Sequence, residues 1–201
     1  DRQFQWVVPQ QFGFAYVFSE GVAAVQASNR AWTYIDKQGT QLIEPRFELA
    51  YSFSDGVAAA LIGADYRYVF LDRSLKEIAS APAGVIYVGQ FSGGLIPAQL
   101  GSVQRLSDGR LYPVGSQNQR GFLDPTGKWA IAPQFAAAAN FSEGLAAVQA
   151  GDKWGYIRPD GTFAIPSRFD TAEPFEDGLA LVSVGGRYAV IQPDGHPIWN
   201  G

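Results

Sequence analysis

The chain has 201 residues, 17% of them charged, and a formal net charge of −4, which fits a globular protein of one domain rather than a disordered one. This acidic balance offers no basic stripe to neutralise phosphates, so we expect no nucleic acid partner. No apolar run approaches the roughly 18–20 residues of a membrane-spanning helix, and no membrane insertion is expected. With no cysteine and one histidine, the chain has no disulfide, and a metal site or cofactor is not expected.

A short motif built on phenylalanine, an acidic residue and glycine recurs along the chain. Four copies read Phe-(Ser/Glu)-(Glu/Asp)-Gly-(Val/Leu)-Ala, and a degraded copy lies between the second and the third. The copies are Phe18–Ala23, Phe53–Ala58, Phe91–Ile96, Phe141–Ala146 and Phe175–Ala180. Their glycines are 35, 38, 50 and 34 residues apart, and a recurring period of this size indicates a repeat architecture.

From the N-terminus onward, the predicted elements are short strands joined by turns. Trp6–Phe12 contains a proline, which places it at a strand end or a sheet edge. Val22–Val25 follows the first motif and is small and apolar, as expected of a strand in a crowded interior. Ala31–Asp36 is rich in aromatic and branched residues, and a glycine turn joins it to Gln41–Phe47. This combination predicts a hairpin.

The same three kinds of strand recur along the rest of the chain. Equivalents of Val22–Val25 are Val57–Ala60, Leu95–Ala98, Leu145–Val148 and Leu179–Val182. Equivalents of Ala31–Asp36 are Arg67–Asp72, Gln119–Asp124, Lys153–Arg158 and Arg187–Gln192. Equivalents of Gln41–Phe47 are Trp129–Phe135 and Phe163–Phe169. No stretch has convincing helical periodicity, so the sequence predicts an all-β fold.

We predict a single domain, 1–201, of five tandem three-stranded β repeats. The units are approximately 5–29, 30–62, 65–100, 118–151 and 152–184, and residues 185–201 would complete the first unit. Ends that complement each other favour a closed propeller-like ring, in which the last strands pair beside the first. The alternative is an open curved β-repeat array. Residues 101–118 stand outside the repeat and are predicted to be an insertion loop with a hairpin turn at Asp108-Gly109.

These repeats resemble the bacterial WG-repeat family, named for a Trp-Gly dipeptide in its first strand. Lys153–Ile157 and Phe141–Val148 match the two halves of the family pattern, and the likeness covers the chain apart from 101–118. Departures from the pattern are Thr33 after Trp32, Tyr68 and Tyr188 in place of tryptophan, and Arg120 before Gly121. The resemblance implies an all-β fold and a binding or scaffolding role, and it supplies no catalytic residue.

The repeated side chains are expected to serve the architecture. The motif phenylalanines are predicted core residues, because a role shared by the units is a structural one; they are Phe18, Phe53, Phe141 and Phe175. The motif acids are expected to bind backbone N–H groups at a turn where glycine has a positive φ. These acids are Glu20, Asp55, Glu143 and Asp177. We therefore assign no catalytic, cofactor-binding or metal-binding residue.

The irregular positions form the candidate binding site. The insertion carries Arg105, Arg110 and Tyr112, and insertions in repeat proteins often lie on the binding face. Arg120 stands where the other units have tryptophan or tyrosine. Arginine and tyrosine are enriched among residues that dominate protein interfaces. The sequence thus predicts a contact patch of Arg105, Arg110, Tyr112 and Arg120, and the structural alternative is a drifted loop with a solvated arginine.

Three functions from different classes stay open. The first is non-catalytic binding to another protein, as a scaffold or as an inhibitor or immunity-type partner of a secreted protein. The second is binding of a cell-envelope glycan or peptidoglycan, for which Trp6, Trp129 and Trp199 are candidate platforms. The third is a glycosidase-like hydrolase, although the alanine-rich strands offer no pair of carboxylates. We expect the first function, and no enzyme.

A periplasmic or secreted bacterial location is expected. The chain begins at Asp1 and contains no methionine, so we expect it to be a processed or trimmed product. A removed signal peptide would explain this start, and cysteine-free chains are common outside the cytoplasm. The alternative is a trimmed cytoplasmic chain.

Overall fold

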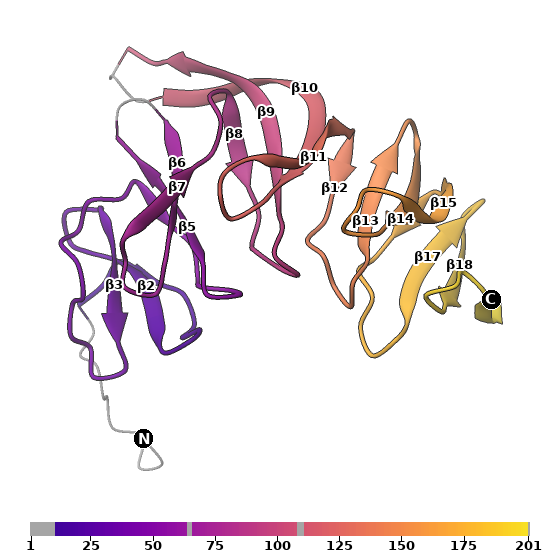
Figure 1. Ribbon diagram of the computed structural model, residues 1–201, viewed down its shortest axis with the longest axis horizontal. Coiled ribbons are helices and arrows are strands. Elements are labelled where there is room, and N and C mark those ends of the chain that lie inside the picture. Colours follow the sequence, from indigo (N-terminus) through magenta and orange to yellow (C-terminus); the bar gives the residue numbers. More distant parts are fainter. Residues whose placement is uncertain (1–10, 64–65, 108–110, 201) are drawn as a thin grey trace.

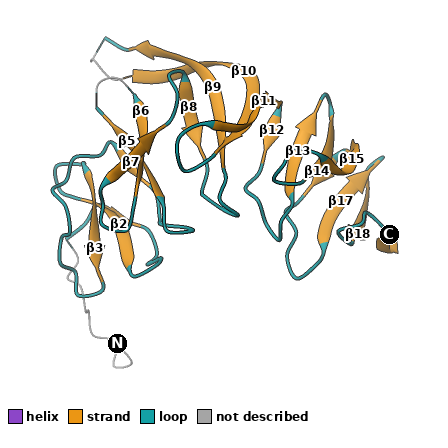
Figure 2. Cartoon of the chain, in the orientation of Figure 1, coloured by secondary structure: helices purple, strands orange, loops and turns teal. Residues whose placement is uncertain are grey.

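The structure, a computed structural model, describes residues 11–63, 66–107 and 111–200. Throughout that part the chain consists of strands and turns (Figure 2). The described residues include no helix that is long and apolar enough to cross a bilayer. The strands form five small antiparallel sheets in chain order, called sheets 1 to 5 below. The predicted all-β repeat fold is confirmed.

The strands follow the chain without crossovers. Sheet 1 consists of β1 (Phe14–Ala15), β2 (Val22–Gln26) and β3 (Trp32–Asp36). Sheet 2 consists of β4 (Leu49–Ala50), β5 (Ala58–Ile62), β6 (Arg67–Leu71) and β7 (Glu77–Ser80). Sheet 3 consists of β8 (Val85–Val88), β9 (Ile96–Arg105), β10 (Leu111–Leu123) and β11 (Trp129–Phe135). Sheet 4 consists of β12 (Ala137–Ala138), β13 (Ala146–Ala150), β14 (Lys153–Ile157) and β15 (Phe163–Phe169). Sheet 5 consists of β16 (Thr171–Ala172), β17 (Ala180–Val184), β18 (Arg187–Ile191) and β19 (Pro197–Asn200).

Sheets 2 to 5 have four strands rather than the three predicted for each repeat. The additional strand precedes the motif phenylalanine, and in β4, β12 and β16 it has only two residues. Two residues are too few for a periodic pattern, so the sequence did not reveal it. In sheet 5, β18 pairs with both β17 and β19, so the C-terminal strands complete their own sheet.

The sheets follow one another along an open arc (Figure 1). Sheet 1 lies at one end and sheet 5 at the other, and no described strand of sheet 1 pairs with a strand of sheet 5. The described residues therefore form the open curved array, the alternative to a closed ring. Completion of sheet 5 from adjacent residues explains this, because its last strands need no partner at the far end of the chain.

The core lies between consecutive sheets. Between sheets 4 and 5, the Tyr156 ring packs on Phe175 with a centroid distance of 4.8 Å, and Val182 completes the contact. The motif phenylalanines of sheets 2 to 5 are buried in this way; they are Phe53, Phe91, Phe141 and Phe175. The prediction was wrong for Phe18, which is 43% exposed. No described sheet precedes sheet 1 to cover its ring.

The motif acid joins one sheet to the next. In the fourth motif Glu143 and Gly144 both have positive φ, 52° and 79°. The Glu143 carboxylate reaches past its own turn and accepts a 2.9 Å hydrogen bond from the N–H of Gly178 in sheet 5. The equivalent bonds join Glu20 to Gly56 and Asp55 to Gly94. Binding of backbone N–H groups was predicted, but a partner in the next sheet was not.

The third motif lacks this connection. Gly93 stands where the other motifs have an acid, so its position supplies no carboxylate to sheet 4. Between sheets 3 and 4, the side-chain carbonyl of Asn140 instead accepts a 3.1 Å hydrogen bond from the backbone N–H of Gln90.

The glycine of the Trp-Gly dipeptide lets the last strand of its sheet approach closely. The ladder between β14 and β15 shifts register beside Gly155. A Cβ on Gly155 would lie 2.6 Å from the carbonyl oxygen of Ile165 and 2.7 Å from the backbone nitrogen of Ser167. Gly121 meets β11 at similarly short distances. A side chain at these positions would collide with backbone, which explains the glycine of the dipeptide.

Candidate functional site

The insertion, predicted as a loop with a hairpin turn, lies within two long paired strands, β9 and β10. β9 and β10 have 10 and 13 residues, whereas their equivalents β13 and β14 have 5 each. Their pairing continues as far as Arg105 opposite Leu111. Asp108, Gly109 and Arg110 lie outside the described residues. Figure 1 shows the hairpin extending well beyond the other strands of sheet 3.

The far part of this hairpin presents apolar side chains to solvent. Val103 and Leu106 on β9 and its continuation are exposed, and Tyr112 on β10 exposes 59% of its surface. The Arg105 side chain lies outside the described part. Isolated exposed apolar residues are ordinary, but several on one projecting element are typical of a contact surface.

Arg120 lies nearer the base of the hairpin and replaces an aromatic ring. Its guanidinium carbon is 5.6 Å from the centroid of the Tyr87 ring, and its Nε donates a 3.1 Å hydrogen bond to Oε1 of Gln99. At the equivalent position in sheet 1, Trp32 stacks on Tyr16 at 5.4 Å. The arginine thus keeps a stacking contact, as a cation–π pair, and adds a positive charge beside the exposed Tyr87.

The structure therefore places Tyr112 and Arg120 on the same strand, β10, and gives Arg120 a structural partner. Of the other two predicted contact residues, only the backbone of Arg105 is described, and Arg110 is not. The four-residue contact patch stays a prediction.

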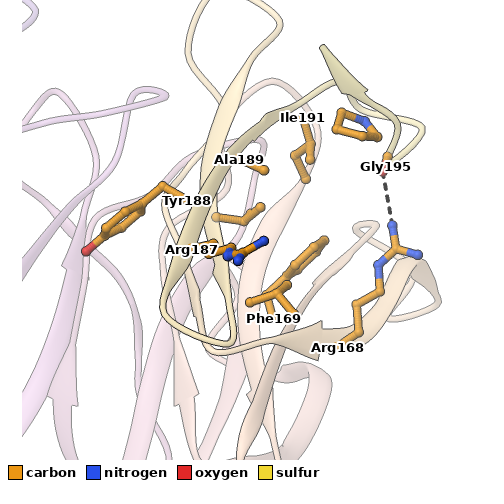
Figure 3. A pocket seen from close by; sticks show the side chains of 10 residues that line it. Arg168, Phe169, Arg187, Tyr188, Ala189, Ile191 and Gly195 are labelled. Atoms are coloured by element: carbon orange, nitrogen blue, oxygen red, sulfur yellow. Dashed lines mark hydrogen bonds between the residues drawn. The ribbon is translucent and has the colours of Figure 1, made fainter. Parts of the chain in front are cut away.

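A cavity of about 410 Å³ lies between sheets 4 and 5, and the sequence reasoning missed it (Figure 3). Its size is within the range of small-molecule sites. The lining is mainly apolar at Phe169, Val182, Ala189 and Ile191. Figure 3 shows the Arg187 side chain reaching toward the middle of the cavity, while the Tyr188 ring points away from it.

The equivalent space is filled at the other three joins between sheets. Leu75, in the turn before β7, packs into the core between sheets 1 and 2. Trp129 packs against the core between sheets 2 and 3, and Phe163 lies edge-on to Phe135 between sheets 3 and 4. In sheet 5 the equivalents of Leu75 and Phe163 are Gly195 and Pro197, which both line the cavity.

The sequence contains a sign of this cavity. The first residue of the last strand is tryptophan in sheet 3 and phenylalanine in sheet 4, and it changes to proline at Pro197 in sheet 5. Comparing the repeats position by position for lost bulky residues, rather than for added charge, would have located the cavity.

Two arginines border the cavity, one from each sheet. Arg168 lies over the Phe169 ring at 5.1 Å and donates a 3.0 Å hydrogen bond from Nη2 to the carbonyl of Gly195. Arg187 is exposed at the start of β18. Asp170 is nearby in sequence, but Lys153 donates to it, as does the N–H of Gly185. These donors hold the pKa of the Asp170 carboxyl below its ordinary value, with Lys153 the larger cause.

Another hollow, of about 520 Å³, lies beside the motif turns of sheets 4 and 5 and is lined by acids. The acids are Glu143, Glu173, Glu176 and Asp177. Glu143 is bonded to Gly178, and the carbonyl of Glu173 accepts a hydrogen bond from the Tyr156 hydroxyl, so both serve the join between the sheets. Among the described residues, no group of three or more histidines, cysteines or acids is arranged to hold a metal ion.

Of the three tryptophans proposed as glycan platforms, the structure describes the side chain of one. Trp129 is half-buried and packs against the core between sheets 2 and 3. Trp6 lies outside the described residues, as does the side chain of Trp199. The one platform that the structure describes therefore serves packing.

Solved structures similar to this chain are propeller-like. Two structures of Hsv2 from Kluyveromyces lactis match with TM-scores of 0.54 and 0.53 at 11% identity, over 92% and 90% of this chain and 61% and 60% of theirs. BamB from Moraxella catarrhalis matches with a TM-score of 0.44 at 11% identity, over 93% of this chain and 62% of its own. The chain thus spans about 60% of the length of the Hsv2 structures, and the likeness to them concerns the fold alone.

No curated protein matches the sequence. The pattern of a family described as "WG containing repeat" matches four segments, residues 1–30, 32–64, 121–154 and 154–188. Residues 65–120, between the second and third matched segments, contain the degraded third motif and the extended part of the β9–β10 hairpin. The four segments together make up more than half of the sequence, and the chain belongs to the WG containing repeat family.

Proposed function

We propose that this chain is a non-catalytic binding module for another protein, and that the β9–β10 hairpin is its main contact element. The observation that carries the proposal is the projection of this hairpin with Val103, Leu106 and Tyr112 exposed. The buried joins between sheets give it a fixed base, so little conformational freedom would be lost on association.

The chemistry of the hairpin suggests what it would contact. Its exposed apolar side chains suit an apolar patch on the partner, and Arg120 beside Tyr87 suits a carboxylate at the rim of that patch. Arg105 and Arg110 would extend the same positive rim. A scaffold and an inhibitor or immunity-type partner of a secreted protein both use such a surface, and we propose a partner in the periplasm or outside the cell.

The decisive experiment removes the hairpin and keeps its sheet. Leu100 opposite Gln119 is equivalent to Ala150 opposite Lys153, where the two-residue turn Gly151-Asp152 closes the hairpin. Replacing residues 101–118 with Gly-Asp should therefore give sheet 3 a hairpin like that of sheet 4. Immobilised wild-type and shortened chains would be incubated with an envelope extract of the source organism, and captured proteins identified by mass spectrometry.

We expect a protein retained by the wild type and lost from the shortened chain. Alanine at Arg105, Arg110, Tyr112 and Arg120 together should reduce its affinity at least tenfold. Alanine at Tyr188, the equivalent of Arg120 in sheet 5, serves as the matched control and should leave affinity unchanged. Equal capture by the wild-type and shortened chains would show that the hairpin is not the contact element.

A further inference from the structure

We propose that the cavity between sheets 4 and 5 is a second binding site, which takes a carboxylate carried on a compact apolar or aromatic group. This site is independent of the proposed protein contact, because it belongs to sheets 4 and 5 whereas the hairpin belongs to sheet 3.

The apolar half of the ligand follows from what the cavity lacks. Three equivalent places between sheets hold a leucine, a tryptophan or a phenylalanine from the protein itself. At Pro197, the equivalent of Trp129 and Phe163, the bulky side chain is missing, while the apolar lining, including Phe169 and Ile191, is kept. A ligand group the size of a phenyl ring or a branched alkyl chain would restore the packing that the other joins have.

The carboxylate follows from the two arginines that border the cavity. One N–H of Arg168 is bound to the carbonyl of Gly195 and its guanidinium lies over Phe169, so the group is oriented while most of its five N–H donors can face a ligand. Arg187 reaches toward the cavity from the opposite sheet (Figure 3). Guanidinium groups match carboxylates with paired hydrogen bonds. The nearby Asp170 does not cancel this charge, because Lys153 and Gly185 already occupy it.

A free organic acid and the C-terminal carboxylate of a peptide ending in an apolar residue share this chemistry. The probes are therefore 3-phenylpropionate, the tripeptide Ala-Ala-Phe with a free carboxylate, and the amides of both. Each is titrated into ¹⁵N-labelled protein, and binding is followed by shifts of assigned amide resonances. We expect one or both acids to shift resonances of residues 168–169 and 182–197, and the amides to bind at least fivefold more weakly. Binding of only one acid identifies the source.

Two variants test the two halves of the site. Pro197→Phe copies Phe163 of sheet 4 and should fill the cavity and abolish the shifts. Arg187→Gln should weaken acid binding roughly five- to tenfold, the loss expected for a partly exposed charged hydrogen bond. Arg67→Gln is its matched control, since Arg67 begins β6 as Arg187 begins β18 and instead pairs with Glu77. A urea titration of each variant confirms that it is folded.

The outcomes separate this site from the proposed protein contact. Acid binding should persist in the chain with the shortened β9–β10 hairpin, whatever that change does to partner capture. The inference is overturned if none of the probes shifts these resonances, if acids and amides bind equally, or if folded Pro197→Phe binds as well as the wild type. Equal losses in Arg187→Gln and Arg67→Gln would also overturn it.

Discussion

The carboxylate of Glu143 in sheet 4 accepts a 2.9 Å hydrogen bond from the N–H of Gly178 in sheet 5, 35 residues further along the chain. The bond is exposed, so its contribution is modest even though the acceptor is charged. We expect Glu143→Gln to lower the free energy of unfolding by about 0.5–1 kcal/mol. The measurement is the urea midpoint at constant slope.

The matched control for this prediction is Asp177→Asn. Asp177 holds the same motif position, but it belongs to the last described sheet, so no following described sheet offers a motif glycine to its carboxylate. We expect this change to leave the urea midpoint close to that of the wild type. Equal destabilisation by both substitutions would mean that the acid stabilises its own turn rather than the next sheet.

Phe175 and Phe18 occupy the same motif position with opposite burial, 1% and 43% exposed. We expect Phe175→Ala to cost about 3–5 kcal/mol, because it leaves a cavity against Tyr156. Phe18→Ala should cost roughly 1 kcal/mol or less, since about half of its surface already meets water. Urea unfolding measures both losses of stability. Similar losses would show that another protein segment covers Phe18 in solution.

Gly155 should not tolerate even a methyl group. Its added Cβ would meet the backbone of Ile165 and Ser167 below 3.0 Å, so Gly155→Ala forces β15 to move. We expect a loss of about 1–3 kcal/mol or more, the range for overpacking. The control is Ala189→Gly, at the equivalent position of sheet 5, which should cost no more than about 1 kcal/mol. A thermal melt that ranks the control as the more damaging change would contradict this account.

Buried tyrosines should make stability fall at high pH. Burial raises the pKa of Tyr51 from 10.0 to about 12, and burial also raises the pKa of Tyr34 and of Tyr156. The folded state therefore keeps protons that the unfolded chain loses above about pH 10. The stabilisation is complete below pH 10 and is lost progressively as pH rises through 12. Urea midpoints between pH 9 and 12 should fall, and less steeply in Tyr51→Phe. A flat profile would contradict the prediction.

The repeated features of this fold could be predicted from the sequence. The motif and the Trp-Gly dipeptide predicted an all-β repeat, and burial of Phe53, Phe141 and Phe175 followed from their recurrence. Repetition exposes a structural constraint because each unit must solve the same packing problem. It reveals nothing about the ends, where a neighbour is missing, and this is why Phe18 was misjudged.

What the sequence hid were relationships between units. The carboxylate of Glu143 was expected at a local turn, yet its partner lies a whole repeat away, and no periodic pattern shows which glycine an acid will reach. A hairpin turn was predicted in the insertion, but its long strands were not, because Gly101–Asn118 has no clear alternation of apolar and polar residues. The cavity escaped notice because it arises from a bulky side chain that Pro197 does not have.

Gly93 in place of the motif acid leaves the join between sheets 3 and 4 without a carboxylate-to-glycine hydrogen bond among the described residues. The carboxylate of Glu20 joins sheets 1 and 2, that of Asp55 joins sheets 2 and 3, and that of Glu143 joins sheets 4 and 5. Between sheets 3 and 4 the Asn140 contact takes the place of this bond. In the part of the chain that the structure describes, that join keeps its buried core but has no charged hydrogen bond of this kind, so we expect it to resist bending less than the other joins. The β9–β10 hairpin lies on one side of the join between sheets 3 and 4, and the cavity lies on the other. Bending at this join would therefore alter the separation between the two proposed sites while leaving each of them intact.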